Sequence, residues 1–429
     1  MKTLFGFLIL LAVSSSCLAG EWIIVSPQTF SRKESVHIGS LRFVFQAEEP
    51  AEAAQAERDQ PVALESLPYP EAPVTDWATK LLGVSKAWSY SQGRGVLVAI
   101  LDTGIDLDHP DLRPNLWRNT GEDWLDPETP GYNGIDDDGN GVVDDYYGYN
   151  TLNDSGNVED DHGHGTAVAE IIGAACRRRC GVAPGVKLLP VKVLNSEGYG
   201  YVSNIIKGIA YALEVQQRTN QPLIFNLSLT MPYFSVALRA ALKEATKNGA
   251  KLFVTAAGNQ GLDLEAYPVY PAAFGLPQVV TVAALGPDLQ LSWFSDYSPN
   301  LVDLAAPGDA VLTCLAAGPC EDIAGTSFAT AYVSGIVALL ASCDPLAPSW
   351  ELKKGLLDGA VRSPELEPFV AEGRVAHALR AVKVFLNLEP ADLSGDGTVN
   401  EEDYVLLTWK IWGQSLVLLP EPWLKEIVP

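Results

Sequence analysis

Apolar runs alternate with amphipathic segments along this chain from about Trp77 to Asn387. Five short runs have the length and composition of buried strands: VLVAI, KLLPVKVL, PLIFNLSL, KLFVTAA and QVVTVAAL. Between or after them lie four segments with the apolar spacing of helices: HGTAVAEIIGAA, VSNIIKGIAYALEVQQ, FSVALRAALKEATKNG and SFATAYVSGIVALLAS. This alternation predicts a mainly parallel sheet that is covered by helices on both faces. We therefore expect an α/β fold, a three-layer α/β/α domain over residues 76–388.

The first 75 residues differ from this domain. Residues 1–19 combine Lys2, the apolar run LFGFLILLAV and small residues near Ala19, which predicts an export signal peptide. The run is too short for a membrane span, and we expect no span elsewhere. Cys17 leaves lipid anchoring open as a minor alternative. Residues 20–75 contain the strand-like segments EWIIVSPQTF and SVHIGSLRFVF, followed by a charged, Ala-rich linker.

The chain carries a formal net charge of −24 and is 47% hydrophobic. The hydrophobic fraction supports a large core, and the acidic charge argues against nucleic-acid binding, which needs clustered Lys and Arg. Export favours disulfides. Cys176 and Cys180 bracket three arginines, and Cys314 and Cys320 bracket a hairpin turn, so each pair could form a bridge. Cys343 is expected to be a buried free thiol. Zinc is the alternative for the pairs, but no matching histidine is near them.

Three segments carry the groups that serine hydrolysis requires: VAILDTGID around Asp102, DDHGHGTAVA around His164 and AGTSFATAYVSG around Ser327. This chemistry needs a hydroxyl nucleophile, an imidazole that takes its proton and a carboxylate that orients the imidazole. Asp102 directly follows a strand run, and His164 and Ser327 begin helical segments, so the three can meet at one edge of the sheet. Structural alternatives are an N-cap role for Ser327 and metal binding by His164 with Asp160, Asp161 and His162.

The motifs and their order, Asp, His, Ser, resemble those of the subtilisin-like serine endopeptidases. The resemblance implies that Ser327 is the nucleophile, that His164 is the general base and that Asp102 orients it. Asn259, in AAGNQG after the run KLFVT, matches the family asparagine whose amide helps to hold the oxyanion. Family members usually carry an N-terminal propeptide, so residues 20–75 are a candidate propeptide and linker.

The same resemblance predicts how a polypeptide substrate binds. An extended peptide would add as a strand between two backbone edges, and a pocket of small residues would take the side chain before the scissile bond. The matching residues are Ser228, Leu229 and Thr230 on one edge, Gly198 on the other, and Ala256, Ala257 and Gly258 in the pocket. Because the three pocket residues are small and uncharged, we expect the pocket to prefer an apolar or aromatic side chain of the substrate.

Several positions depart from the family pattern without removing a catalytic group. Glu170 stands where glycine is common in the helix after His164, and Ala331 with Tyr332 replaces a usual Pro-His pair after the nucleophile. Glu170 is the least expected of these residues, because a charged side chain must fit where close backbone contact is usual. We therefore expect the packing around Glu170 to differ from that of the family.

Two acidic loops predict structural Ca²⁺, which binds oxygen ligands at alternate positions of a loop with a glycine at its sharp turn. The first loop, NGIDDDGNGVVDD, supplies Asp136, Asp138 and Asn140. The second loop, DLSGDGTVNEED, lies in the small C-terminal segment 389–429 and precedes an amphipathic helix. Its candidate ligands are Asp392, Ser394, Asp396, Thr398, Asn400 and Asp403.

The second loop resembles one repeat of a dockerin, a module that binds cohesin partners. Dockerins have two such repeats and this chain shows one, so a structural calcium loop is the main expectation and a cohesin-like partner a minor one. For both loops the alternative stays open that they are solvated acidic turns that bind no metal.

Together these patterns predict a secreted, monomeric serine endopeptidase that cleaves polypeptides through a Ser327 acyl-enzyme. The alternative from another class is a catalytically silent protease fold that acts as a calcium-dependent binding or scaffolding protein. Peptide ligation or ester hydrolysis would use the same triad.

Overall fold

The computed structural model describes residues 22–25, 35–39, 41–46, 56–58, 61–64, 77–122, 133–314 and 320–388. The predicted signal peptide, Cys17 and the dockerin-like loop lie outside these residues, and their assignments stay predictions.

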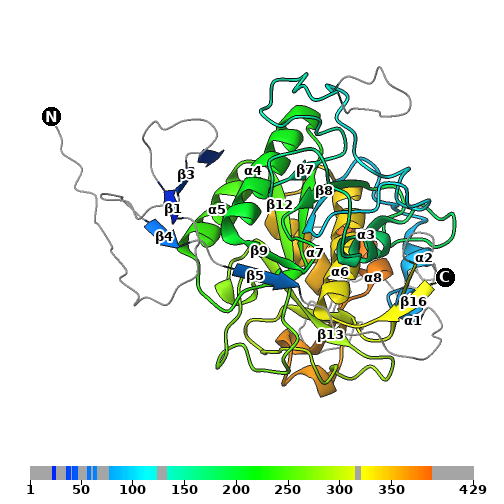
Figure 1. Cartoon of the computed structure of the whole chain (residues 1–429). Helices are drawn as coiled ribbons and strands as arrows, with labels where there is room; N and C mark the ends of the chain where they lie inside the picture. The colour runs from blue at the N-terminus through cyan, green and yellow to red at the C-terminus, as the bar shows by residue number, and fades with distance from the viewer. Residues whose placement is uncertain are drawn as a thin grey trace, which may run out of the picture.

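A mainly parallel sheet forms the centre of the described structure (Figure 1). Its nine strands lie in the order β17-β18-β14-β13-β12-β10-β6-β8-β7. All neighbouring strands are parallel except the β17–β18 pair. The strands are β6 (Leu97–Asp102), β7 (Tyr149–Asn150), β8 (Lys187–Lys192), β10 (Leu223–Leu227), β12 (Ala250–Ala256), β13 (Val279–Leu285), β14 (Leu304–Pro307), β17 (Val361–Arg362) and β18 (Arg374–Val375). The five predicted strand runs form its five adjacent central strands, from β13 to β8.

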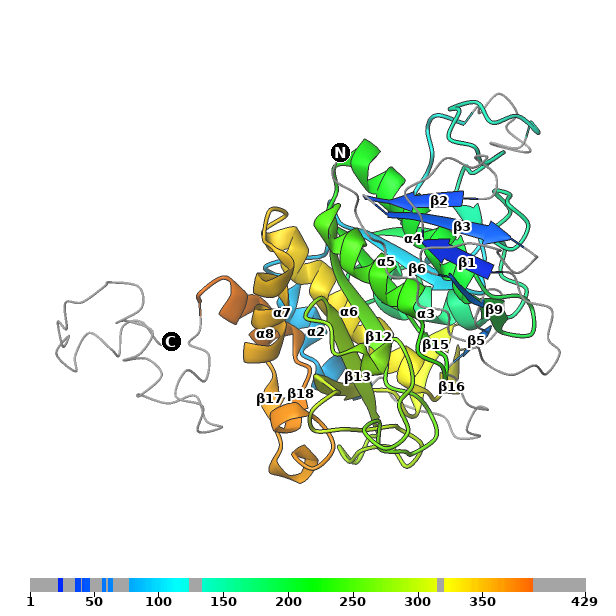
Figure 2. The same ribbon diagram turned by 90° about the vertical axis from the view of Figure 1, so that its left-hand side faces the viewer.

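Helices cover both faces of this sheet, as the apolar pattern predicts (Figure 2). One face carries α3 (His164–Gly173) and α6 (Thr326–Cys343), and the other carries α4 (Val202–Thr219) and α5 (Val236–Lys247). Strand β6 shows why its sequence is continuously apolar: Val98 and Ile100 enter the α3–α6 core, whereas Leu97, Ala99 and Leu101 enter the α4–α5 core. Successive side chains of a strand point to opposite faces, and both faces are buried. The three-layer α/β/α architecture is therefore confirmed.

Shorter elements complete the domain around α6. They are α1 (Trp77–Leu81), α2 (Val84–Ala87), α7 (Ser349–Asp358), α8 (Ala378–Phe385), the hairpin β15 (Val311–Cys314) and β16 (Cys320–Ile323), and the 3₁₀ turns η2 (Ala272–Phe274), η3 (Pro364–Leu366) and η4 (Ala371–Gly373). Among the described helices, α6 alone is long and apolar enough to cross a membrane, and 89% of that apolar window is buried inside the domain. Helix α6 is apolar all round because it packs in the centre of a core.

The N-terminal strands form a separate antiparallel sheet, in the order β2-β3-β1-β4, which lies against α4 and α5 (Figure 2). These strands are β1 (Trp22–Val25), β2 (Ser35–Ile38), β3 (Leu41–Gln46) and β4 (Ala56–Arg58). Ile38 and Phe43 are buried in the same core as the inner sides of α4 and α5. The strand-like segments of the N-terminal region thus fold as strands and pack on the helical layer.

Candidate active site

Asp102 lies at the carboxyl end of β6 and faces His164, the first residue of α3. The Asp102 Oδ1 atom is 2.7 Å from His164 Nδ1 and also accepts the backbone N–H of Thr103 at 2.7 Å. Because the carboxylate accepts, Nδ1 of His164 carries the proton and Nε2 is left as the acceptor. Gly165 is required beside this contact, since a Cβ there would lie 2.1 Å from the carbonyl oxygen of Gly104.

The turn before α3 is organised by Asp160, which the sequence offered only as a metal ligand. Its carboxylate accepts hydrogen bonds from Thr103 Oγ1 (2.8 Å) and from the backbone N–H of Gly163 (2.9 Å). It also accepts the N–H and the hydroxyl of Thr166, at 2.9 and 2.6 Å. Burial raises the pKa of Asp160, but the bonds from Thr166 and Gly163 outweigh burial and hold the pKa below its usual value. Asp160 thereby holds the first turn of the helix that begins at His164.

Ser327 lies in the first turn of α6, where the sequence predicts the nucleophile. Its Oγ donates to the backbone carbonyl of Ser228 at 3.2 Å, and the Ser228 hydroxyl donates to the Ser327 carbonyl at 3.0 Å. The imidazole of His164 contacts the ring of Phe328, the next residue, with 5.5 Å between ring centroids. Within the described residues, His164 Nε2 is buried without a hydrogen-bond partner, so it is available as a proton acceptor beside the start of α6.

Asn259 follows β12 and contacts the same turn. Its Oδ1 atom accepts both the backbone N–H and the hydroxyl of Thr326, each at 2.9 Å. With Oδ1 engaged, the Nδ2 amide is buried and lacks a partner in the part of the chain that the structure describes. Asp296, which sequence reasoning missed, supports this loop by accepting the N–H groups of Gln260 (3.0 Å) and Leu262 (2.8 Å). Asn259 therefore presents an N–H donor next to the first turn of α6, as an oxyanion there would need.

Strand β5 (Pro61–Leu64) lies beside β9 (Tyr199–Tyr201) (Figure 1). It also pairs with β11 (Leu229–Thr230), so that β5 is the middle strand of an antiparallel three-stranded sheet. Leu64 pairs with Leu229, and Val62 pairs with Gly200. The two outer strands are the edges that the sequence assigns to a polypeptide substrate, with Ser228 and Gly198 immediately before them. A segment of the N-terminal region thus lies along both predicted substrate edges.

The predicted pocket residues Ala256, Ala257 and Gly258 continue from the end of β12 toward Asn259. They are buried, and the small size of Gly258 is required, because a Cβ there would lie 2.1 Å from Asp296 Oδ2. A carboxyl group that the sequence did not reveal is therefore next to this predicted pocket. Burial raises the pKa of Asp296 despite the backbone N–H groups that it accepts.

Comparison with known proteins matches this arrangement. The family model described as "Subtilase family" matches residues 93–381. The chain belongs to the subtilase family. With the subtilisin-like fold and the serine protease relatives, this membership makes the protein a serine-type endopeptidase.

This subtilase is similar to two bacterial enzymes. It is 36% identical to "Intracellular serine protease" of Paenibacillus polymyxa, over 61% of this chain and 71% of that protein. It is 37% identical to "Major intracellular serine protease" of Bacillus subtilis, over 61% of this chain and 74% of that protein. Identity to "Subtilisin-like protease 1" of Plasmodium berghei is 30%, and that match spans 67% of this chain and 49% of the relative. The solved structure of a cold-adapted subtilisin-like serine proteinase superposes with a TM-score of 0.54 at 27% identity, covering 67% of this chain and 90% of that one.

The first acidic loop of this subtilase gathers carboxylates. Ligand atoms of Glu122, Asp136 and Asp138 lie within 4.8 Å of one another. Glu122 is 3% exposed, and neither of its carboxylate oxygens has a hydrogen-bond partner among the described residues. Burial, with the charges of Asp145 and Asp138, raises the pKa of Glu122 to about 8. A hard divalent cation would satisfy these oxygens and cancel the repulsion between them, so the residues present fit Ca²⁺.

Sequence reasoning named two of these three carboxylates but missed Glu122, which lies 14 positions before Asp136 with no motif to mark it. Asn140, the third predicted ligand, instead uses its side chain within the loop: Oδ1 accepts the N–H of Val142 and Nδ2 donates to Asp145. The tertiary structure thus adds Glu122 from a neighbouring segment to the predicted ligands, and the assignment of Asn140 as a ligand stays a prediction.

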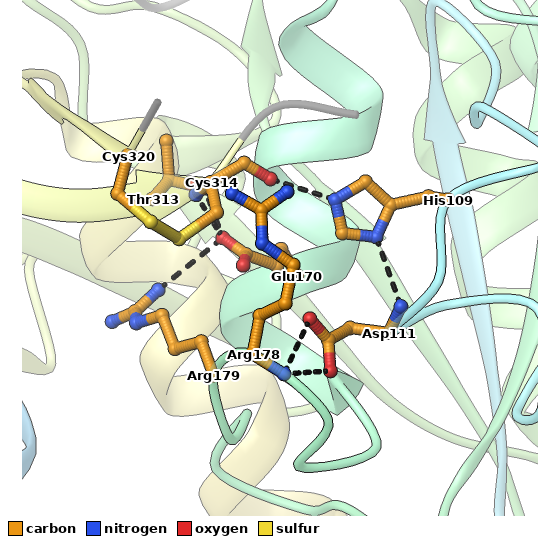
Figure 3. The surroundings of a disulfide bond; sticks show 8 residues. All are labelled: His109, Asp111, Glu170, Arg178, Arg179, Thr313, Cys314 and Cys320. Atoms are coloured by element: carbon orange, nitrogen blue, oxygen red, sulfur yellow. Dashed lines mark hydrogen bonds and ion pairs between the residues drawn. A yellow bond between two sulfur atoms is a disulfide. The ribbon is translucent and has the colours of Figure 1, made fainter. Parts of the chain in front are cut away.

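Both predicted disulfides are present, Cys176–Cys180 and Cys314–Cys320. Cys343 is the free cysteine of the described residues, and it is partly rather than fully buried. Glu170, the least expected residue of the sequence, is fully buried on α3 and contacts the β15–β16 hairpin (Figure 3).

Proposed function

We propose that this subtilase is an exported endopeptidase that hydrolyses peptide bonds through a Ser327 acyl-enzyme. The observation that carries the proposal is the 2.7 Å contact between Asp102 and His164, with His164 Nε2 free of other partners among the described residues and next to the first turn of α6. In this geometry the imidazole can accept the serine proton while the carboxylate stabilises the imidazolium that forms.

The steps follow from these positions. As Nε2 of His164 takes the proton, Ser327 Oγ forms a bond to the substrate carbonyl carbon, and the carbonyl oxygen becomes an oxyanion. The oxyanion accepts from Asn259 Nδ2 and from backbone N–H at the start of α6. The C–N bond then breaks as His164 returns the proton to the leaving amine. Water, deprotonated by His164, attacks the ester, and Ser327 recovers its proton as the acid product leaves.

A fluorophosphonate probe tests this proposal, because it labels only an activated serine. We expect the calcium-loaded mature protein to label at Ser327 and to cleave a peptide library, whereas the Ser327→Ala and His164→Ala variants do neither. A mature protein that stays unlabelled while chymotrypsin labels in a parallel reaction would favour the silent binding protein. Transpeptidation products or ester cleavage without peptide cleavage would favour the other acyl-transfer activities.

We also propose that residues 20–75 act as a propeptide and that the protein is made as a zymogen. The position of β5 between β9 and β11 supports this, because a chain segment there excludes a substrate strand. Ser327 is fully buried and His164 is 3% exposed in the same state. The test expresses residues 20–429 as wild type and as Ser327→Ala. We expect the wild type alone to lose its N-terminal segment. An active wild type that keeps the segment, or a Ser327→Ala protein that loses it in the absence of other proteases, would contradict the proposal.

Export and calcium binding are further parts of the proposed function. The two disulfides support an oxidising compartment, since such bonds are rare in a reducing cytosol. Glu122, Asp136 and Asp138 would hold a structural Ca²⁺, which supplies charge neutralisation and loop rigidity when bound. The loop from Asp392 to Asp403 stays a candidate for a second ion and for a cohesin-like partner. Mass spectrometry of the secreted Ser327→Ala protein, which is expected to keep its N-terminal segment, would reveal whether the N-terminus begins after Ala19 or at a lipidated Cys17.

A further inference from the structure

Glu170 lies on the same rigid helix as His164 and is the buried centre of a network between the two catalytic helices (Figure 3). Its Oε2 atom accepts the hydroxyl of Thr313 at 2.5 Å and the backbone N–H of Cys314 at 2.6 Å. Both donors belong to β15, the first strand of the hairpin whose second strand leads through Gly325 to Ser327. The side chain therefore joins the helix of the base to the segment that delivers the nucleophile.

Arg179 completes this network from the loop that the Cys176–Cys180 disulfide closes. Its Nη1 lies 3.5 Å from Glu170 Oε2, and its Nη2 donates to the hydroxyl of Tyr332 at 3.1 Å. Tyr332 is fully buried on α6, five residues after Ser327. Of the three consecutive arginines in the loop, Arg179 alone is buried, and Arg177 and Arg178 are exposed.

The loop and the hairpin are held from a second side by His109 and Asp111 (Figure 3). The His109 Nε2 atom lies 2.8 Å from the Cys314 carbonyl oxygen, and its Nδ1 accepts the N–H of Asp111 at 3.3 Å. Asp111 in turn accepts the backbone N–H groups of Arg177 (2.5 Å) and Arg178 (2.9 Å). Cys314 is thus fixed at its N–H by Glu170 and at its carbonyl by His109, while the arginine loop is fixed at its backbone.

Two departures of the sequence from the family pattern meet at this point. Glu170 stands on α3 where the family commonly has glycine, and Tyr332 stands on α6 where it usually has histidine. Arg179 contacts both side chains. A buried carboxylate without a cation would be strongly destabilising, as would a buried guanidinium without a carboxylate. Glu170 and Arg179 therefore form a unit in which each offsets the charge of the other.

We propose that Glu170 and Arg179 are positioning residues, which set the nucleophile of α6 against the base of α3 through the hairpin and Tyr332. This inference rests on the proposed triad chemistry. A small misplacement of the reacting groups lowers kcat, whereas the strands β9 and β11, which would bind the substrate, lie outside the network.

The test uses substitutions that separate charge from shape. Glu170→Gln keeps an acceptor for Thr313 and Cys314 but removes the carboxylate charge that faces Arg179. Arg179→Met removes the cation and keeps most of the volume. Arg177→Met, an exposed arginine of the same disulfide loop, is the matched control. Fluorophosphonate titration counts active sites, so that kcat is expressed per folded, competent enzyme.

We expect Glu170→Gln and Arg179→Met each to lower kcat per active site about 10- to 100-fold, with KM changed by less than about 3-fold. Because the pair is a unit, the Glu170→Gln/Arg179→Met double variant recovers part of the kcat that either single variant loses. A purely structural role would reduce the number of titrated sites and leave their kcat unchanged, and it would contradict the proposal. Independent, multiplying losses in the double variant would contradict it too.

If the charged single variants do not fold, Tyr332→Phe carries the test, since it keeps the core volume and removes one Arg179 contact. We expect it to lower kcat by about 3- to 10-fold, and wild-type kcat would refute the proposal. The wild type and Arg177→Met show whether the proposed function itself holds. If both label and cleave while the other variants match them, only the positioning role fails.

Discussion

Replacing Asn259 separates the contact that its side chain makes with Thr326 from the oxyanion role that we propose for it. Oδ1 accepts the N–H and the hydroxyl of the fully buried Thr326, and Nδ2 is left for the oxyanion. Asn259→Ala removes both functions. Asn259→Asp is nearly isosteric and keeps an acceptor for Thr326, but it replaces the oxyanion donor with an oxygen.

The expected magnitudes follow from these contacts. Removal of one oxyanion donor lowers kcat about 10²–10³-fold, or about 2.7–4 kcal/mol of transition-state stabilisation, a range that was established on a subtilisin and is therefore the family's own. Asn259→Ala additionally leaves the buried Thr326 donors without their acceptor, which costs about 1–3 kcal/mol of folding stability. Asn259→Asp avoids this second cost, so its kcat falls at least as far while its Tm stays closer to that of the wild type.

The assay measures kcat and KM on a peptide substrate, counts active sites by titration and follows Tm in the same buffer. We expect both variants to lose kcat with KM nearly unchanged, and only Asn259→Ala to show a clear loss of Tm. An Asn259→Asp protein whose kcat stays within about 3-fold of wild type would refute the assignment of Nδ2 as an oxyanion donor. A loss confined to KM would place Asn259 in substrate binding instead.

The other predictions concern acid, calcium and the disulfide loop. Because the folded pKa of Asp160 is depressed, its carboxylate stabilises the fold above the ordinary pKa of about 3.9, and this contribution is lost as pH falls through the folded value. Asp160→Asn should therefore lower Tm at pH 6, and its Tm should converge on that of the wild type as pH falls through the folded pKa of Asp160. A Tm difference that does not shrink as pH falls from 6 into this acid range would contradict this prediction. Chelation with EGTA should lower the wild-type Tm by several degrees and the Glu122→Gln Tm by much less. The control variant Asp137→Asn, at an exposed position of the same loop, should respond to EGTA as the wild type does. Equal Tm shifts in all three proteins would exclude Glu122 as a ligand. The Cys176→Ser/Cys180→Ser variant should lose kcat as Arg179→Met does, and combining the two changes should cause no further loss. Additive losses of kcat would show that the disulfide loop does not act through Arg179.

Much of the fold could be predicted because it depends on local patterns. The runs that form β6, β8, β10, β12 and β13 are apolar on both faces, and only a sheet covered on both sides buries them. The shorter strands β14, β17 and β18 at the other end of the sheet were missed, since their few residues carry no period of their own. The disulfides were predictable because each pair closes a short loop of contiguous sequence.

The residues of the candidate site also fall into two groups, those that the sequence predicted and those that only the folded structure revealed. Asp102, His164, Ser327 and Asn259 could be named from motifs, because each lies in a short segment of characteristic sequence. Glu122, Asp160, Asp296 and β5 have roles that depend on segments distant in sequence, and a motif does not encode such contacts.

The sequence by itself determined the family, the layered α/β/α architecture and the four residues of the proposed catalytic machinery, because these depend on hydrophobic period and on motifs of a few residues. Only the tertiary structure decided how Glu170 is accommodated. A buried carboxylate lowers the stability of the fold strongly unless hydrogen-bond donors or a cation lie within a few ångströms of it. Here Arg179, Thr313 and Cys314 contact Glu170, Arg179 from the Cys176–Cys180 loop and the other two from the hairpin that the Cys314–Cys320 bond closes. Those partners are 9, 143 and 144 positions away along the chain, so their proximity is a property of the folded molecule.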